Sequence, residues 1–85
     1  MRADVKEAID LYAKNKVHPG YFLEAVMCNN LKEAFGRADQ ENISDMFDIV
    51  RYVYWEIPAL AWGSPEKVKA WLENGNSLIK EDTDE

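Results

Sequence analysis

The side chains that most often carry out catalysis are few in this sequence and lie apart along the chain. His18 is the only imidazole, Cys28 is the only thiol, and Ser64 stands directly before a proline. A nucleophilic Cys or Ser needs a general base within reach, and His18, in a turn before Pro19, is typical of a solvated or capping side chain. We therefore expect an inert thiol at Cys28, a helix cap at Ser64 and no enzyme activity.

Metal and phosphate chemistry are not indicated either. The sequence has no calcium-loop spacing and no Glu-x-x-His pair, and its four glycines are scattered instead of forming a phosphate-binding loop. A single cysteine supplies neither an intramolecular disulfide nor a cysteine metal cluster, and it is typical of a reducing compartment. We expect no metal and no cofactor.

One segment does suggest a contact site. In Asp39–Ile57, Asp39 is a suitable N-cap and Pro58 a helix stop. The apolar residues step by three and four along one face: Ile43, Met46, Phe47, Val50, Val53, Tyr54 and Ile57. The opposite face carries an acidic stripe that runs into two aromatic residues: Glu41, Asp45, Asp48, Tyr52 and Trp55.

Two interpretations of this stripe stay open. Tyr and Trp are enriched at interface hot spots, so the stripe is a candidate surface for binding a protein partner. The acidic residues are alternatively a solvated helix face, and Trp55 alternatively packs against the apolar loop over residues 58–63. Arg37, between two predicted helices, is expected to pair with Asp39 or Glu41; the alternative is binding of an anionic ligand in an oligomer.

The elements around this segment are all predicted to be helical. A first helix runs from Ala3 to about Lys16, and its buried stripe is predicted to be Val5, Ala8, Ile9 and Tyr12. A second helix begins at Pro19 and reaches Gly36. We favour one bent helix across Asn29–Asn30, with two short helices as the alternative. A last helix follows the Ser64-Pro65 start signal and ends at Gly75. Leu60 and Trp62, in the loop before it, are expected to tuck against the bundle.

These patterns predict an all-α protein, a compact bundle of about four helices without a sheet. Residues 1–75 form one domain, and residues 76–85 form an acidic tail that we expect to be disordered. The inward side chains are predicted to make one contiguous core: Phe22, Leu23, Val26, Phe35, Phe47, Val50, Val53, Tyr54, Trp71 and Leu72. On this assignment, Phe47→Ala should unfold the protein.

Charge and size limit the choice of partners. Ten basic against sixteen acidic residues give the 85-residue chain a formal net charge of −6, which disfavours direct nucleic-acid binding. No apolar run approaches the roughly 20 residues that a membrane span needs, and the charged N-terminus lacks an apolar signal core, so we expect a cytosolic protein. A chain this short also makes a homo-oligomer possible.

From Pro19 to Leu72 the chain resembles a family of small proteins of tailed bacteriophages and prophages. The matching pieces, in order, are Pro19-Gly20-Tyr21-Phe22-Leu23, Ala25-Val26, Asn29-Asn30-Leu31, Ala34-Phe35-Gly36-Arg37-Ala38-Asp39 with Asn42, Tyr52-Val53-Tyr54, Glu56-Ile57-Pro58, Trp62-Gly63-Ser64-Pro65-Glu66 and Trp71-Leu72. The order of these pieces is more specific than any one of them. The resemblance implies a phage accessory protein that acts in the bacterial cytoplasm, and it supplies no catalytic residues.

Two functions are consistent with this resemblance. The first is a non-catalytic inhibitor that binds a host or anti-phage defence protein with a basic surface, through Glu41, Asp45, Asp48, Tyr52 and Trp55. The alternative is a small oligomeric protein that sequesters a nucleotide-type signalling molecule between subunits, with Arg37 at the anion.

Overall fold

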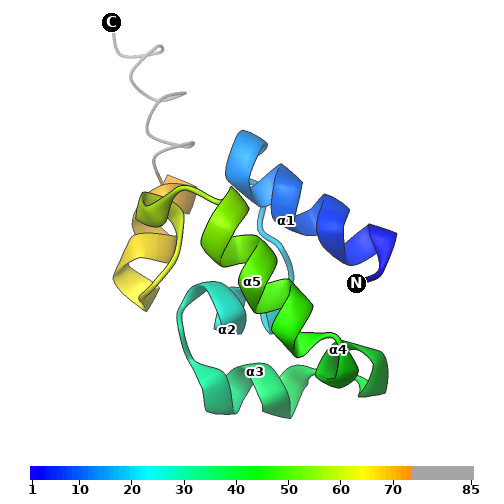
Figure 1. Ribbon diagram of the computed structural model, residues 1–85. Helices are drawn as coiled ribbons and strands as arrows, with labels where there is room; N and C mark the ends of the chain where they lie inside the picture. The colour runs from blue at the N-terminus through cyan, green and yellow to red at the C-terminus, as the bar shows by residue number, and fades with distance from the viewer. Residues whose placement is uncertain (74–85) are drawn as a thin grey trace, which may run out of the picture.

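The part of the chain that the structure describes is built from helices joined by short connections. The computed structural model describes residues 1–73 (Figure 1). Its elements are α1 (Ala3–Asn15), α2 (Tyr21–Met27), α3 (Leu31–Arg37), α4 (Gln40–Ser44), α5 (Met46–Glu56) and the 3₁₀ helix η1 (Ala59–Ala61), followed by a helix over residues 65–73. Residues 1–73 contain no strand, so the all-α prediction is confirmed, with shorter and more numerous helices than expected. The predicted helix end at Gly75 and the predicted tail over residues 76–85 lie outside the described residues.

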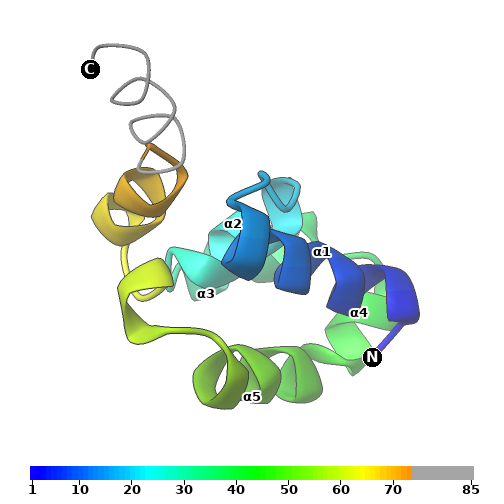
Figure 2. The same ribbon diagram turned by 90° about the horizontal axis from the view of Figure 1, so that it is seen from above.

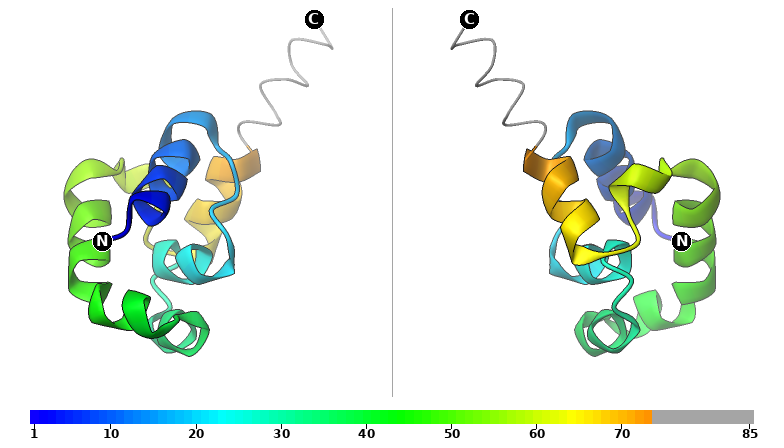
Figure 3. Two further views of the ribbon diagram at one scale, coloured as in Figure 1. Left: turned by 90° about the vertical axis from the view of Figure 1, so that its right-hand side faces the viewer. Right: turned by 90° about the vertical axis from the view of Figure 1, so that its left-hand side faces the viewer.

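The helices enclose the core from two sides. Figure 2 shows α5 opposite α1, α2 and α3, with the chain after α5 passing along one end of the molecule. In both views of Figure 3, α5 forms one side and the helix over residues 65–73 lies toward the other, with α1 between them. Within residues 1–73, this arrangement leaves the outward side of α5 without a neighbouring helix.

The buried side chains form two clusters instead of the single core predicted. The larger one joins α1, α2, α5, η1 and the last helix: Val5, Ile9, Tyr12, Leu23, Met27, Ile49, Val53, Ile57, Ala61 and Val68. The smaller one joins α2, α3 and α5 through Ala25, Ala34 and Met46. Phe22 and Val26 are half-buried and pack against both clusters, so they connect the two.

α1 has the predicted length and the predicted buried stripe. Val5, Ile9 and Tyr12 face the core at the helical period. Lys16 ends the helix in the left-handed conformation, with φ 57°, and its N–H donates to the Tyr12 carbonyl at 3.1 Å. This is a common helix C-cap, because it satisfies a carbonyl that the helix leaves free.

Positive φ angles mark both ends of α2, and they correct two predictions. Gly20 has φ 95°, a conformation that a residue with a side chain rarely adopts, so the helix begins at Tyr21 and not at Pro19. Asn29 has φ 62° and interrupts the chain after α2. Asn30 then caps α3, because its side-chain oxygen accepts the backbone N–H three residues on at 3.2 Å. The single bent helix is therefore wrong, and two short helices are present.

The helix predicted over Asp39–Ile57 is likewise two helices. Its start is confirmed: Asp39 Oδ1 accepts the Asn42 N–H at 2.8 Å. The chain then turns at Asp45, with φ −92° and ψ 2°, between α4 and α5. Asn42, Ser44 and Asp45 are weak helix formers whose side chains compete for backbone hydrogen bonds, and the bend leaves Asn42 only 7% exposed.

The buried face of α5 differs from the predicted one. The core receives Met46, Ile49, Val53 and the following Ile57. Five residues assigned to the interior are exposed instead: Phe35, Ile43, Phe47, Val50 and Tyr54. The prediction failed because the apolar side chains of α5 extend beyond the part of the helix that α1 and α2 cover, so that Phe47, Val50 and Tyr54 remain exposed.

The connection after α5 is held by hydrogen bonds to backbone carbonyls. The Tyr12 hydroxyl donates to the Ala61 carbonyl at 2.5 Å, and Trp62 Nε1 donates to the Ile57 carbonyl at 3.2 Å. Trp62 is half-buried, as expected. Leu60 is 74% exposed, so its expected packing against the bundle is wrong.

The last helix begins as predicted. Ser64 Oγ accepts the Lys67 N–H at 3.2 Å, which confirms the predicted cap. Val68 is buried and Trp71 is half-buried, and Trp71 Nε1 donates to the Tyr12 carbonyl at 2.9 Å. This bond docks the helix over residues 65–73 onto the end of α1.

Candidate functional site

The outward side of α5 exposes an unusual amount of aromatic surface. Phe47, Tyr54 and Trp55 are 74%, 60% and 70% exposed. The Tyr54 and Trp55 rings meet edge to face, with centroids 5.1 Å apart and planes at 87°. Contiguous exposed apolar surface is a feature of interaction sites in soluble proteins.

Part of this side is a mixed charged and aromatic surface, which we call the α5 outer face. It consists of Asp48, Arg51, Trp55 and Glu56, which line a shallow depression together with Met1 and Tyr52. Within residues 1–73, neither Asp48 nor Glu56 forms an ion pair. Their carboxylates are therefore available to a partner.

The open question about Trp55 has a structural answer. The indole is not buried under the connection after α5; instead Tyr54 contacts Trp62, with ring centroids 5.9 Å apart. Trp55 therefore contributes little to the core.

Two acidic residues of the predicted stripe are engaged by the N-terminal segment. Glu41 Oε1 lies 3.4 Å from Arg2 Nη1, and the same nitrogen lies 3.3 Å from Asp39 Oδ2. Asp45 Oδ2 lies 3.7 Å from the terminal ammonium of Met1, and its side chain is 24% exposed. Part of the charge of the stripe is thus neutralised within the molecule.

Tyr52 turns toward α1 instead of continuing the stripe. Its hydroxyl donates to Asp10 Oδ1 at 2.5 Å, and Lys6 Nζ lies 5.4 Å from the centre of its ring. The hydrogen bond raises the pKa of Tyr52 and lowers the pKa of Asp10. Tyr52 is therefore a contact between α1 and α5, at the edge of the α5 outer face.

The structure brings together Asp48 and Trp55 from the predicted stripe and adds Arg51 and Glu56. These two were missed, although Arg51 follows Asp48 by three residues and precedes Trp55 by four, the spacing of one helix face. The helical spacing could have found them, whereas the engagement of Asp45 by the N-terminus depends on tertiary structure.

Arg37 has different partners from those predicted. Its guanidinium lies 3.1 Å from Glu33 and 3.8 Å from Glu24, and it donates to the Tyr21 carbonyl at 3.0 Å. Arg2 occupies the carboxylates of Asp39 and Glu41 instead. Two carboxylates beside Arg37 offset its positive charge, so no observation favours an anion site there.

The side chains with catalytic potential lie in structural roles. His18 Nδ1 accepts the Gly20 N–H at 3.1 Å, and its Nε2 lies 3.2 Å from Glu24, so it orders the turn before α2. Cys28 is half-buried at the end of α2, and burial raises the pKa of its thiol. Among residues 1–73 no group of three or more His, Cys, Asp and Glu side chains could hold a metal ion.

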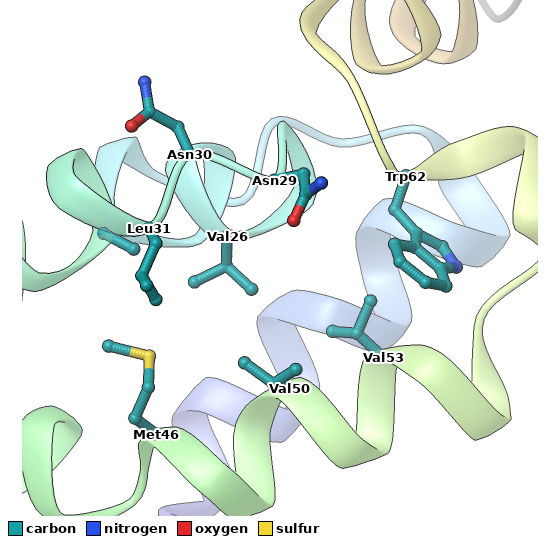
Figure 4. Close-up of a pocket in the computed structure, with 9 residues that line it drawn as sticks. Val26, Asn29, Asn30, Leu31, Met46, Val50, Val53 and Trp62 are labelled. Carbon is teal, nitrogen blue, oxygen red and sulfur yellow. The ribbon is translucent and has the colours of Figure 1, made fainter.

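A second feature, an apolar groove, was not predicted from the sequence. Figure 4 shows Val26 and Leu31 facing α5 across it, and the cavity has a volume of about 110 Å³. We define the α3–α5 groove by six of its lining residues: Val26, Leu31, Ala34, Met46, Val50 and Val53. Trp62 stands at one end, and Asn29 and Asn30 complete the lining. The groove is lined from α2, α3 and α5 and from the residues that separate α2 from α3.

Comparison of the chain with protein-family models, with curated proteins and with solved structures finds no match. Within the described residues, no helix is both long and apolar enough to cross a membrane.

Proposed function

We propose that this chain is a non-catalytic protein that binds another protein through the α5 outer face and inhibits it. The observation that carries the proposal is the exposure of Trp55, 70% of which faces solvent on a helix where Asp48 and Glu56 have no ionic partner in the described part of the chain. Burying that indole in a partner would contribute roughly 3–4 kcal/mol, which is the scale of a binding hot spot.

The charge of this region suggests the chemistry of the partner. On the α5 outer face, two carboxylates that form no ion pair within residues 1–73, Asp48 and Glu56, stand against the single positive charge of Arg51. A partner with a basic surface around an apolar pocket for the indole would complement this face. The same charge opposes binding to nucleic-acid phosphates.

The resemblance to small phage proteins supports a target in the bacterial cytoplasm, a host protein or a component of an anti-phage defence system. Small phage accessory proteins commonly act by stoichiometric binding, and binding through one helix face needs no catalytic group. Sequestration of a nucleotide-type signal gains no support, because Glu24 and Glu33 already surround Arg37.

The proposal is tested by capture from bacterial lysate followed by an activity assay of the captured protein. Trp55→Ala and the charge reversal Asp48→Lys should each reduce its affinity at least tenfold, which corresponds to about 1.4 kcal/mol. Wild-type protein should inhibit the target at a ratio near one to one, and the two variants should inhibit it weakly.

The matched control is Tyr21→Ala. Tyr21 is also an exposed aromatic residue, 74% exposed, but it lies on α2 and not on α5. The Tyr21→Ala variant should capture and inhibit the target as the wild type does. Equal capture by all four proteins would exclude the α5 outer face, and a captured protein whose activity is unaffected would exclude inhibition.

A further inference from the structure

The outward side of α5 carries a second hollow beside the depression of the α5 outer face. Its lining is mostly apolar: Phe47, Val50, Arg51, Tyr54 and Trp55. We call it the apolar hollow. Phe47, Val50 and Tyr54 are 74%, 46% and 60% exposed, so their side chains are accessible to a partner. The apolar hollow is separate from the α3–α5 groove, although Val50 lines both.

One row of side chains separates the apolar hollow from the depression. Phe47, Arg51 and Trp55 follow one another by four residues, and Arg51 and Trp55 line both hollows. Rows of residues four apart form the ridges of a helix surface, and the grooves between them receive the ridges of a second helix. The two hollows are therefore the two grooves beside one ridge of α5. A helix is the element that fits them.

The outer rows decide the chemistry of each groove. On one side, Val50 and Tyr54 are four residues apart and complete the apolar hollow. On the other side, the row of Asp48, Tyr52 and Glu56 borders the depression. Asp48 and Glu56 form no ion pair within residues 1–73. A helix that packs here therefore meets an apolar groove and, beside it, an acidic one.

The charges oppose a second copy of this chain as that helix. Two α5 helices packed on each other would bring Asp48 and Glu56 of both copies toward one interface, with one Arg51 from each copy to offset them. Four carboxylates, two from each copy, would then face two guanidinium groups, and like charges in an interface cost binding energy. A helix with lysine or arginine in the acidic groove would instead form pairs of opposite charge.

We propose that the partner of the α5 outer face supplies an amphipathic helix that packs along α5. One row of this helix is apolar and lies in the apolar hollow, and a neighbouring row carries lysine or arginine and lies in the depression. The Trp55 indole lies between the two rows and is covered from both sides. This inference rests on the proposed function, because it names the element of the partner that the α5 outer face binds.

Two synthetic peptides test this proposal without a target protein. Both are amphipathic helices of about five turns with leucine on one face; one carries lysine beside the leucine rows, and the other carries glutamate there. Binding to the full-length chain is followed by the NMR shift of the Trp55 indole N–H, which the variant Trp55→Phe assigns. The lysine peptide should shift this resonance and should bind about tenfold more tightly than the glutamate peptide.

Two variants distinguish the grooves. Phe47→Ala should weaken binding of the lysine peptide about tenfold and leave its salt dependence unchanged, because it removes apolar area alone. Asp48→Asn combined with Glu56→Gln should also weaken binding, and it should flatten the dependence on NaCl between about 50 and 500 mM, because the charges that salt screens have been removed. Circular dichroism checks that both variants remain folded.

The matched control is Glu7→Gln combined with Glu66→Gln. It removes the same charge from two exposed positions on α1 and the last helix, and neither residue forms an ion pair within residues 1–73. The control should bind the lysine peptide with the affinity and salt dependence of the wild type.

Three results would overturn the proposal: a lysine peptide that leaves the Trp55 resonance unshifted, equal binding of the two peptides, or α5 variants that bind like the control. No target protein enters these measurements, so their outcome is distinct from that of capture and inhibition. A chain that inhibits a captured target but fails to bind the lysine peptide would retain the proposed function and exclude the partner helix.

Discussion

Tyr12 shows how much of this fold depends on single side chains. It is fully buried, its hydroxyl donates to the Ala61 carbonyl, and its own carbonyl accepts the indole N–H of Trp71. One residue of α1 thus holds both the connection after α5 and the last helix. Burial raises the pKa of Tyr12 well above its ordinary value of 10.0, because a phenolate would lose its hydration there.

Replacing this hydroxyl should lower stability at neutral pH and change the response to alkali. Tyr12→Phe leaves the Ala61 carbonyl without its donor, and we expect a loss of about 1–3 kcal/mol in the free energy of unfolding, measured by urea titration at pH 7. Above pH 10.0 the unfolded chain releases the Tyr12 proton while the folded chain keeps it, so the wild type loses stability as pH rises.

The variant should lose less stability than the wild type over the same alkaline range, because it lacks the titrating group. Tyr54→Phe is the control, since Tyr54 is 60% exposed and its replacement should change neither measurement appreciably. Identical alkaline slopes for wild type and Tyr12→Phe would contradict the assignment.

At the scale of the element, α5 has more apolar surface than its neighbours cover. Ile49 is fully buried against the larger cluster, whereas Phe47, two residues earlier, is 74% exposed. Two positions close together on one helix therefore differ in what they contribute to the free energy of unfolding: Ile49 contributes to it, and Phe47 contributes little. Burial of the Ile49 side of α5 stabilises the fold. The Phe47 side is exposed and is available for binding.

This division predicts opposite outcomes for two alanine variants. Ile49→Ala should cost about 2–5 kcal/mol and leave the protein largely unfolded at 37 °C, because it removes a buried side chain from a small core. Phe47→Ala should change the free energy of unfolding by less than about 1 kcal/mol. Thermal melts of the two variants at the same protein concentration compare them directly. An unfolded Phe47→Ala protein would restore the inward assignment made from the sequence.

At the scale of the whole molecule, few polar contacts join α1 to α5. The Tyr52 hydroxyl donates to Asp10, and Lys6 lies 3.0 Å from the other oxygen of the same carboxylate. The hydrogen bond from Tyr52 is the main cause of the lowered pKa of Asp10. This contact stabilises the Asp10 carboxylate in the folded state and holds the two helices together.

The fold should therefore weaken in acid in a way that depends on Tyr52. Because the folded pKa of Asp10 lies below its ordinary 3.8, the contribution is present above that pH and is lost as pH falls through the folded value. Tyr52→Phe should raise the pKa of Asp10, followed by the NMR shift of its carboxyl carbon, and should make the acid loss of stability smaller. Tyr21→Phe is the control, and an unchanged Asp10 pKa in Tyr52→Phe would exclude the contact.

Several features of the fold follow from local sequence alone. The caps at Asp39 and Ser64 were predicted because a capping side chain bonds to a backbone N–H only three residues away. The buried stripe of α1 was predicted because its apolar residues are few enough to define one face. The all-α class follows from the helical period of the chain as a whole.

Other features depended on tertiary structure. The apolar arc of α5 is broader than one packing contact, so its period could not distinguish Ile49 from Phe47 as the buried residue; the position of α1 decides. Arg37 reaches Glu24 because α2 and α3 fold back on each other after Asn29, whereas its pair with Glu33 is an i,i+4 contact within α3 that helical spacing could have predicted. The two candidate sites differ in the same way. Helical spacing alone places Asp48 and Trp55 on one face of α5, so this pair could be predicted from the sequence. The α3–α5 groove forms only where separate segments of the chain meet, so it could not be predicted.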